Sequence, residues 1–535
     1  VSMIITFVLI GKYLEVIGKK KAIDTLDTIK STLPVQATVI TENIKKIVSL
    51  DTVKIDDIVE LKTGEKAGVD GTVISGEANF DESSITGESM PIAKTKDSKI
   101  YSGTLNLDGI IRYKATKNYA NSTLNSIVTM IEDSLMHKPP IEKKANKASV
   151  FFSFTILSIA ILTFFGWYYF DKELFYLEDS SRFETALIVA ISVIVIACPC
   201  ALALATPMAS LVGISWLAKK NILFKEASLL ETFAKANTLV LDKTGTITKG
   251  KMAVKSSYFL DKNDKDINIL YSLVSSSTHP VSIAIKNYLE KEHETLGHLE
   301  LQNFKTIQAK GIYAVHEGSE LVGGNLEILN QFNIQNNINT NNTIFAFAIN
   351  SKLTAYFELE DEIKENAKEI IEQIKNLKIS VIMLTGDNEK VAASIADAVG
   401  IDTFYSNMTP FDKAEYIKSL KDSGKIVVMA GDGVNDALAL SKSDIAITMG
   451  AGADISIAVS DVVLLNNSLQ ALLDSFKISK RTYSFIKQNL AISLIYNTVT
   501  IPLAVMGFVI PLVAALSMSL SSLLVVGNSM RIKND

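Results

Sequence analysis

The chain has few cysteines and no excess of basic residues, and each shortage excludes a class of protein. Only Cys198 and Cys200 occur among its 535 residues. With no cysteine elsewhere, a disulfide scaffold is excluded. The formal net charge is −5, which argues against a nucleic-acid partner, because a protein that binds a polyanion normally carries a basic surface.

The start of the sequence also lacks two common features. It has neither an initiator methionine nor the basic n-region of a signal peptide, and Val1 lies inside an apolar run. We therefore expect the chain to be part of a longer protein whose N-terminal part is missing.

Charged side chains are absent from three long stretches, residues 150–170, 185–218 and 488–530. A membrane-spanning helix needs roughly 20 apolar residues, and the hydrophobic fraction of 48 % is high for a soluble protein. We predict about six membrane helices, of which the first, residues 1–22, is cut short.

Prolines and glycines mark the irregular points of these stretches. Pro199 and Pro207 lie inside the second stretch, so we expect a helix broken at those prolines, and a broken helix in a bilayer usually lines a site. In the third stretch, Gly507 and Pro511 predict a hairpin between two spans.

Lysine and arginine flank the apolar stretches on one side, for example at 219–220 and 480–487, and the positive-inside rule makes that side cytoplasmic. Two segments on this side, residues 22–145 and 219–487, are too long for connecting loops and are expected to fold. The first has β-branched residues at alternating positions, which predicts a small β domain. The second alternates strand-like and helical stretches, as a doubly wound α/β sheet does.

The second cytoplasmic segment contains an aspartate suited to phosphoryl chemistry. Asp242 begins the sequence Asp-Lys-Thr-Gly-Thr-Ile-Thr directly after the apolar run 238–241, which indicates a buried parallel strand. At the carboxyl end of such a strand the carboxylate can act as a nucleophile and form an aspartyl phosphate. An acidic residue that only begins a turn is the alternative.

Two further strand-like runs, 381–384 and 426–430, are also followed by polar turns. The polar residues after these runs, with one lysine between them, are Thr385, Asp387, Lys413, Asp432, Asn435 and Asp436. Three strand ends that converge would supply a nucleophile, a hydroxyl that holds phosphate and carboxylates for Mg²⁺. Each motif alone could be an ordinary turn.

Together these motifs resemble those of P-type ATPases, pumps that couple an aspartyl phosphate to ion movement across a membrane, and the resemblance covers nearly the whole chain. It implies that Asp242 is phosphorylated and that Asp432 binds Mg²⁺ with it. The resemblance also implies that the following residues hold the phosphoryl group, the nucleotide or Mg²⁺: Thr244, Thr385, Asp387, Lys413, Asn435 and Asp436.

ATP is expected to bind between residues 251 and 358, where the motifs are weaker. His279, in Ser-Thr-His-Pro, resembles the histidine that orients adenine in heavy-metal P-type ATPases, and Gly311 and Asn325 match later positions of that family's nucleotide site. A lone structural histidine is the alternative. Many metal pumps have a glutamate five residues before the histidine, but this chain has Val274.

The predicted β domain carries Asp-Glu-Ser-Ser-Ile-Thr-Gly-Glu-Ser at residues 81–89, which resembles the actuator loop of P-type ATPases. The resemblance implies that Glu88, in a loop that includes Thr86, aligns water to hydrolyse the aspartyl phosphate. A solvated acidic turn is the alternative.

The membrane segments indicate the transported ion. Cys198 and Cys200 flank Pro199, and paired thiolates select soft ions such as Cu⁺. Cys-Pro-Cys at this place is typical of heavy-metal-transporting P-type ATPases, while two buried structural cysteines are the alternative. The motif alone does not separate copper from zinc.

The last apolar stretch, residues 488–530, contains neither histidine nor carboxylate, the ligands that Zn²⁺ usually recruits. Its Tyr-Asn and Met-x-x-Ser-Ser sequences resemble the copper-transporting branch. The resemblance implies a Cu⁺ site completed by four residues, and a glutamate where copper enters: Tyr496, Asn497, Met518, Ser522 and Glu15. Ordinary packing residues and a snorkelling carboxylate are the alternatives.

The predicted fold is that of a multidomain membrane protein. An α-helical transmembrane bundle carries a β-rich actuator domain, a Rossmann-like, haloacid-dehalogenase-like phosphorylation domain and an α+β nucleotide-binding domain. The predicted boundaries are 1–22 for a partial membrane helix, 23–145 for the actuator domain, 146–222 for the helix pair with Cys-Pro-Cys, 223–250 and 359–478 for the phosphorylation domain, 251–358 for the nucleotide-binding domain and 479–535 for the last helix pair.

The predicted function is ATP-driven export of Cu⁺ from the cytosol, with ATP and Mg²⁺ as cofactors, by an integral protein of the bacterial inner membrane whose catalytic domains are cytoplasmic. Membrane lipid and a copper chaperone are the expected partners. Residues 229–236 look closest to the branch that supplies copper for oxidase assembly. The alternatives are a pump for Zn²⁺ or another heavy metal, a metal-binding receptor that no longer pumps, and a phosphatase on a membrane anchor.

Overall fold

A computed structural model describes most of the chain from Gln36 to Lys533. The described part has gaps at 42–43, 83–90, 127, 130–138, 170–181, 198–199, 261–262, 294, 308–309, 336–337, 339–342, 433–435 and 451–459, and before Gln36 it includes only residues 6, 9, 13, 16, 17 and 34. The chain forms two compact units. The first comprises Val1–Asn237, Ile417–Met429 and Leu440–Asp535, and the second comprises Thr238–Tyr416 and Ala430–Ala439.

The N-terminal part of the first unit contains two small β-sheets. One has the strand order β2-β1-β3-β9-β4-β7 and the other β6-β5-β8. The strands are β1 (Gln36–Thr41), β2 (Ile44–Ser49), β3 (Ile58–Leu61), β4 (Gly71–Ser75), β5 (Ala78–Asp81), β6 (Ile92–Lys94), β7 (Lys99–Ile100), β8 (Leu105–Asn106) and β9 (Ile111–Ala115). In β9 the residues Ile111, Tyr113 and Ala115 are buried and the two between them are exposed, so one face of the sheet covers a core, as the alternating sequence predicts.

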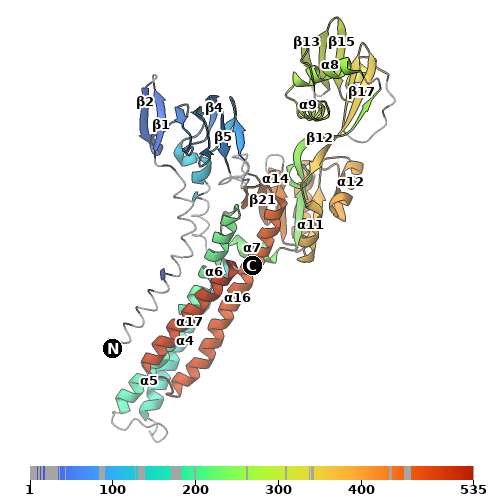
Figure 1. Cartoon of the computed structure of the whole chain (residues 1–535). Coiled ribbons are helices and arrows are strands. Elements are labelled where there is room, and N and C mark those ends of the chain that lie inside the picture. Colours follow the sequence, from blue (N-terminus) through green and yellow to red (C-terminus); the bar gives the residue numbers. More distant parts are fainter. Residues whose placement is uncertain are drawn as a thin grey trace. The chain divides into compact units, whose positions relative to one another are not determined.

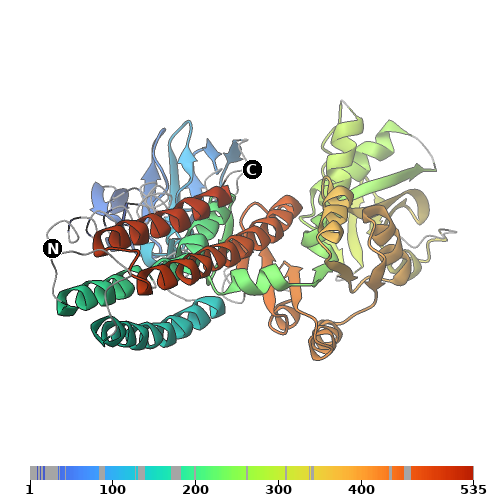
Figure 2. The same cartoon turned by 90° about the horizontal axis from the view of Figure 1, so that it is seen from below.

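Within its described residues, the first unit also contains five long helices. They lie side by side in both views (Figure 1, Figure 2). They are α4 (Pro140–Tyr169), α5 (Arg182–Ile196), α6 (Cys200–Lys219), α16 (Leu469–Val505) and α17 (Pro511–Met530). Among these described residues, three helical stretches are long and apolar enough to cross a membrane: α4, the run from Arg182 to Lys219, and Pro511–Lys533. The chain turns between the end of α16 and the start of α17, where Gly507 and Pro511 predicted a hairpin. Next to this turn, Trp167 Nε1 of α4 donates a hydrogen bond to Val505 O at 2.9 Å.

The run from Arg182 to Lys219 contains two prolines that were expected to break it, and the break expected at Pro199 stays a prediction. Helix α5 ends at Ile196 and α6 begins at Cys200, next to Pro199, which lies outside the described residues. The prediction of a second break at Pro207 is wrong, because α6 continues through that residue. Proline removes only one helical hydrogen bond, and the dense packing of α6 against α16 and α17 holds the helix together.

A seven-stranded sheet has the order β10-β22-β21-β20-β11-β18-β19. Its strands are β10 (Ile222–Phe224), β11 (Thr238–Asp242), β18 (Ser380–Leu384), β19 (Thr403–Tyr405), β20 (Val427–Gly431), β21 (Ile445–Met449) and β22 (Val462–Leu464). Within the second unit, β11 pairs with β18 and β18 with β19, all in parallel. All five residues of β11 are buried, as expected for a strand with both faces covered.

A separate antiparallel sheet of six strands lies within the second unit, in the order β12-β17-β16-β15-β14-β13. Its strands are β12 (Thr248–Phe259), β13 (Gln302–Ile307), β14 (Gly311–His316), β15 (Ser319–Gly324), β16 (Thr343–Ile349) and β17 (Lys352–Ile363). Helices α8 (Asp264–Ser275) and α9 (Pro280–Glu292) pack on the sheet through a shared hydrophobic core. The predicted fold class, a helical bundle with a β-rich domain, a Rossmann-like α/β domain and an α+β domain, is confirmed.

Candidate functional site

Asp242 is the last residue of β11, and its carboxylate is held by the turn that follows. Thr244 N donates a hydrogen bond to Asp242 Oδ2 at 2.8 Å. Gly245 has φ of 71°, a left-handed conformation that glycine adopts without strain. The turn therefore brings a backbone amide back to the carboxylate, while burial leaves Asp242 only 5 % exposed.

Lys413 joins two carboxylates at this point. Helix α13 (Pro410–Asp422) carries Lys413, whose Nζ lies 2.5 Å from Asp242 Oδ1 and 2.8 Å from Asp436 Oδ1. All three side chains are buried. A single buried ammonium thus offsets part of the charge of two carboxylates, which would otherwise be costly to bury.

Burial shifts the proton affinities of this cluster. It raises the pKa of Asp242 to about 6, with a further contribution from the charge of Asp436, although Lys413 opposes the shift. Burial also raises the pKa of Asp436. Burial by itself would lower the pKa of Lys413, but the two carboxylates outweigh this effect and raise the pKa of Lys413. The lysine therefore stays charged, and both carboxylates hold their protons to a higher pH than an exposed aspartate does.

The donor set at Asp242 fits a magnesium ion. Asp436 Oδ2 is buried and has no hydrogen-bond partner in the described part of the chain, so it can accept a further ligand. Asp432 follows β20, and a Cβ placed on Gly245 would lie 3.5 Å from the Asp432 Cβ. No group of three or more His, Cys, Asp or Glu side chains that could hold a metal occurs within the described residues, but Mg²⁺ commonly takes one or two carboxylates and completes its shell with phosphate and water.

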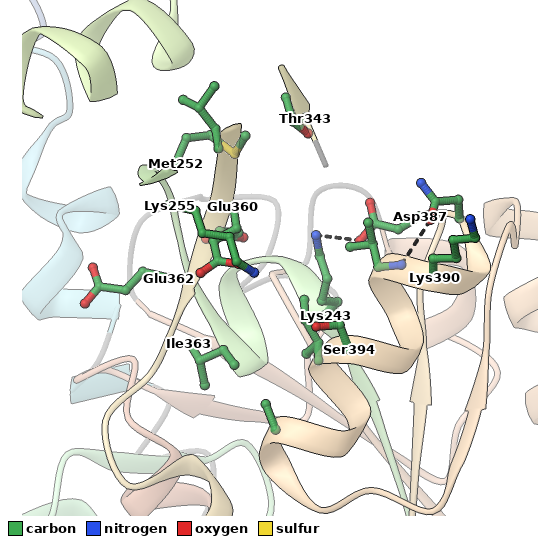
Figure 3. Close-up of a pocket in the computed structure, with 16 residues that line it drawn as sticks. Lys243, Met252, Lys255, Thr343, Glu360, Glu362, Ile363, Asp387, Lys390 and Ser394 are labelled. Carbon is green, nitrogen blue, oxygen red and sulfur yellow. Dashed lines mark hydrogen bonds and ion pairs between the residues drawn. The ribbon is translucent and has the colours of Figure 1, made fainter. Parts of the chain in front are cut away.

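Thr385 and Asp387 follow β18, the strand next to β11. Thr385 Oγ1 lies 3.1 Å from Asp387 Oδ2 and accepts a hydrogen bond from Asp387 N. Lys243 Nζ forms an ion pair with Asp387 Oδ2 at 2.6 Å, and Figure 3 shows the two side chains pointing toward each other. Parallel pairing of β11 and β18 thus brings both polar turns to one edge, as the sequence predicts.

A large cavity of about 650 Å³ opens beside this ion pair. The strands β12 and β17 supply Lys255 and Glu360 to its wall, and α12 (Glu389–Val399) supplies Lys390 (Figure 3). A small cavity of about 250 Å³ lies in the antiparallel sheet domain. Thr343, the first residue of β16, lines both cavities, which are therefore adjacent.

The three residues expected to bind nucleotide, His279, Gly311 and Asn325, all line the small cavity. His279 caps the N-terminus of α9, and its Nδ1 accepts a hydrogen bond from Val281 N at 3.4 Å. In the neutral ring the proton is therefore on Nε2, which is left as a donor. Asn325 caps α10 (Leu326–Gln331) with its side-chain oxygen.

Gly311 lines the small cavity, and close packing against the neighbouring strand also requires glycine at this position. A Cβ at this position would lie 2.1 Å from Gly323 O on the neighbouring strand, so only glycine fits. Val274 is fully buried in the core between α8 and the sheet and does not line the small cavity. The carboxylate expected in many metal pumps is therefore replaced here by a core residue.

The residues expected to bind Cu⁺ in the last two helices occupy different environments. Asn497 on α16 is 5 % exposed, and its Oδ1 has no hydrogen-bond partner among the described residues. Ser522 on α17 is buried, while Met518 is half-buried. Tyr496 donates a hydrogen bond to Ser517 Oγ at 2.9 Å and so links α16 to α17. A buried, unpaired amide oxygen is costly unless it binds something.

Several predicted site residues lie outside the described part of the chain. These are Glu15, Thr86, Glu88, Cys198 and Asn435. Cys200 begins α6, but its side chain is also outside the described set. Their roles stay predictions from the sequence.

The structure adds Lys364 and Asp361, two residues that the sequence did not single out. Lys364 Nζ donates a hydrogen bond to Gly245 O at 2.9 Å, and Thr248 Oγ1 donates one to Asp361 Oδ2 at 2.5 Å. Gly245 lies in the turn after Asp242, and Thr248 directly follows that turn. Asp361 lies near the end of β17, and Lys364 directly follows β17. No local pattern distinguishes Lys364 from the other lysines in this charged segment, so only the tertiary contact reveals it.

Two family models match this chain. Residues 31–132 match the P-type ATPase actuator domain, and residues 236–444 match the haloacid dehalogenase-like hydrolases. The first region contains the two small β-sheets, and the second contains Asp242, Lys413 and Asp436. The family models thus independently support the resemblance to actuator and phosphorylation domains that the sequence motifs indicated.

Curated relatives resemble the chain from end to end. The copper-exporting P-type ATPase of Staphylococcus haemolyticus is 38 % identical over 543 residues, which cover 99 % of this chain and 67 % of the relative. The copper-exporting P-type ATPase of Staphylococcus saprophyticus is 38 % identical over 541 residues, with the same coverage. The chain therefore spans about two thirds of the length of these relatives.

The fold has counterparts among solved structures. The crystal structure of a zinc-transporting PIB-type ATPase in an E2.Pi state has a TM-score of 0.64 at 24 % identity, and covers 99 % of this chain and 87 % of that one. At this identity the likeness concerns the fold alone. Taken with the family models and the relatives that match along the whole chain, these findings show that the chain belongs to the P-type ATPase family.

Proposed function

We propose that this integral membrane protein exports Cu⁺ from the cytosol by forming an aspartyl phosphate on Asp242. The observation that carries the proposal is the buried contact of 2.5 Å between Lys413 Nζ and Asp242 Oδ1 at the end of a parallel strand. In this arrangement the carboxylate is desolvated and oriented, and a cation lies where the oxygens of a transferred phosphoryl group would be.

In the proposed first step, one oxygen of Asp242 attacks the γ-phosphorus of ATP. A bond forms between that oxygen and phosphorus, the bond from phosphorus to the β,γ-bridging oxygen breaks, and ADP leaves. Lys413 and Thr385 bind the phosphoryl oxygens. Asp242 and Asp432, with Asp436 nearby, would hold Mg²⁺, which when bound neutralises charge on the phosphate oxygens.

The two cavities support binding of ATP in an extended form. The base would lie in the small cavity, where the Nε2–H of His279 can donate to a ring nitrogen, and the triphosphate would run past Thr343 into the large cavity. Lys243, which pairs with Asp387, is placed to exchange that partner for a phosphate oxygen.

The ion is proposed from the membrane residues and the relatives. Cys198 and Cys200 supply soft thiolates, and the unpaired Oδ1 of Asn497 is an additional buried donor. The relatives that match along the whole chain are copper-exporting P-type ATPases. Zinc transport has no comparable support, because residues 488–530 contain no histidine or carboxylate.

Completion of the cycle is assigned to the actuator loop. Glu88 would accept a proton from the water that attacks the phosphorus of phosphorylated Asp242, so that phosphate leaves and the carboxylate is regenerated. We place the protein in the bacterial inner membrane with its catalytic domains in the cytosol, where a copper chaperone could deliver the ion.

The test is acid-stable incorporation of label from γ-labelled ATP into the purified protein, with Cu⁺, with Zn²⁺ and without added metal. Labelling that requires Cu⁺ and disappears in Asp242→Asn is the expected result. Labelling with Zn²⁺ alone would reassign the ion, and no labelling with any metal would favour a receptor that does not pump. Asp422→Asn, at the end of α13, is the matched control and should label normally.

A further inference from the structure

The turn after Asp242, residues Lys243–Ile247, is held by side chains and backbone from the end of β17. Lys364 Nζ donates to Gly245 O at 2.9 Å, and Lys364 N donates to Ile247 O at 3.0 Å. These two hydrogen bonds come from one residue and reach both halves of the turn. Lys364 is 119 residues from Gly245 in the sequence, so the contact depends on the tertiary fold.

A second set of contacts fastens the end of the same turn. Thr248 Oγ1 donates to Asp361 Oδ2 at 2.5 Å and accepts from Gly245 N at 3.2 Å. The Thr248 side chain is fully buried. Gly245 is therefore held at its N–H through Thr248 and at its carbonyl by Lys364.

The geometry of this turn matters because it orients the nucleophile. Gly245 is in the left-handed region, with φ of 71°, and Thr244 N beside it donates to Asp242 Oδ2. If Gly245 were free to rotate, the amide that orients the carboxylate would move with it. A displacement of about 1 Å can reduce catalysis about 100-fold.

We propose that Lys364 and Asp361 are positioning residues that hold the backbone of the Lys243–Ile247 turn and thereby fix the orientation of the Asp242 carboxylate. The proposal rests on the proposed phosphorylation of Asp242. Neither residue touches the Asp242 carboxylate in the contacts described above. Both act through the turn, at the point where β17 ends.

The environment of Lys364 supports this role. Burial lowers the pKa of its amine to about 7, although the charge of Asp361 opposes the shift. Lys364 is half-buried, and partial removal of an ammonium group from water has a cost in free energy. By contrast, Lys249 and Glu362, on the same two strands, form an ion pair whose side chains are 34 % and 52 % exposed. Within the described part of the chain, the side chains of that ion pair make no hydrogen bond to the carbonyl groups of the turn, so the pair provides a matched control.

The experiment compares Lys364→Met, Lys364→Arg, Asp361→Asn and the control Lys249→Met in the full chain. Phosphorylation of Asp242 is measured in two ways: from ATP with Cu⁺, and from inorganic phosphate with Mg²⁺ in the absence of nucleotide. Nucleotide affinity is measured separately, by competition with a fluorescent ATP analogue. Thermal unfolding of each variant identifies any protein that has not folded.

For Lys364→Met we expect both phosphorylation reactions to slow by about 10- to 100-fold, because a turn that shifts by a fraction of an ångström to about 1 Å misplaces the Asp242 carboxylate. Nucleotide affinity should change by no more than about threefold, less than one ordinary hydrogen bond. Lys364→Arg should recover most of the rate, because it retains a donor, and Lys249→Met should behave as wild type. Normal rates in Lys364→Met, or a defect seen only with ATP and accompanied by weaker nucleotide binding, would overturn the proposal.

A second measurement does not depend on activity. Amide hydrogen exchange in the peptide that contains residues 243–248 should be about 3- to 10-fold faster in Lys364→Met than in wild type, because the turn loses one hydrogen bond. Unchanged exchange would contradict the positioning role even if the variant folded poorly elsewhere. If the wild-type protein were not phosphorylated by either route, the proposed function would fail, while the exchange experiment would still decide whether Lys364 holds the turn.

Discussion

Lys413 Nζ lies 2.5 Å from Asp242 Oδ1, although the two residues are 171 positions apart in the sequence. The same ammonium lies 2.8 Å from Asp436 Oδ1. Since all three groups are buried, the lysine is the main local compensation for two carboxylates. Its removal should therefore affect both the nucleophile and the binding of phosphate.

The first prediction concerns Lys413→Met. Removal of one partner of a buried ion pair leaves an uncompensated charge and typically costs about 3–5 kcal/mol, so phosphorylation from ATP should fall by at least about 100-fold. Lys418→Met, at an exposed position of the same helix, should retain the wild-type rate. Equal rates in the two variants would show that Lys413 is not needed for phosphoryl transfer.

The second prediction is a pH dependence. The pKa of Asp242 is raised to about 6 by burial and by the charge of Asp436, so the carboxylate becomes protonated as the pH falls through that value. Because a protonated carboxyl group is a poor nucleophile, the rate of phosphorylation should rise with pH across about pH 6. In Asp436→Asn the midpoint should move to lower pH, since a negative neighbour is lost.

That profile is measured as the initial rate of labelling from saturating ATP between pH 5 and pH 8. ATP binding to Asp242→Asn over the same range provides the control, because it reports any loss of nucleotide affinity. A profile that is flat through pH 6 would mean that the carboxylate titrates elsewhere once ATP is bound.

The third prediction concerns Asn497 in the membrane region. Asn497→Ala removes the buried, unpaired Oδ1, and we expect Cu⁺-dependent phosphorylation to weaken by about 10- to 100-fold, the range seen when a metal site loses a supporting polar group. Phosphorylation from inorganic phosphate should be nearly unchanged. Thr498→Val, at an exposed position of the same helix, is the control, and bound copper per protein is the direct measurement.

The fourth prediction tests the packing of α6 against α16. A Cβ on Gly213 would lie 2.5 Å from Thr482 Oγ1, so Gly213→Ala should lower the free energy of unfolding by about 1–3 kcal/mol, as overpacking commonly does. Gly213→Ala combined with Thr482→Ala should recover part of this loss, because the second substitution removes the hydroxyl and methyl that clash. Thermal unfolding in detergent measures both. No recovery in the double variant would mean that the backbone, and not Thr482, limits the space.

The fifth prediction separates two roles of His279. Its Nδ1 caps α9, and its Nε2 is available to a nucleotide. His279→Asn should retain the cap, because asparagine caps helices well, and should weaken ATP binding by about 3- to 10-fold, the effect of one hydrogen bond. ATP binding is followed by competition, with His298→Asn as the control. Unfolding temperatures that fall in parallel with affinity would indicate a structural histidine.

Local sequence was sufficient to predict several parts of the site. Asp242 follows a run of buried strand residues, and Thr385 follows the neighbouring parallel strand, because hydrophobic runs and polar turns depend on near neighbours in the chain. Alternating β-branched residues similarly predicted a small β domain, and β9 has buried residues at alternate positions. The break at Pro207 was predicted wrongly, because the packing around α6 was not visible in the local pattern.

Other features could be found only from tertiary contacts. Lys364 reaches Gly245 across 119 residues. Nothing in its neighbours in the sequence separates it from Lys249, which pairs with Glu362 and, among the described residues, does not contact the turn carbonyl. The glycine at 213 likewise reads as an ordinary helix residue until Thr482 is seen beside it. Such contacts depend on the register and packing of distant segments, which local propensity does not specify.

The sequence by itself determined the chemistry of this protein: an aspartate suited to phosphorylation, a pair of thiols in an uncharged stretch, and apolar runs long enough for membrane helices. Each of these depends on residue type and short spacing. The tertiary structure decided how the groups act together, because burial and long-range contacts set the raised pKa of Asp242, its pairing with Lys413, and the support of its turn by Lys364. Charge interactions and desolvation are properties of the folded environment, and no single segment of the chain contains them.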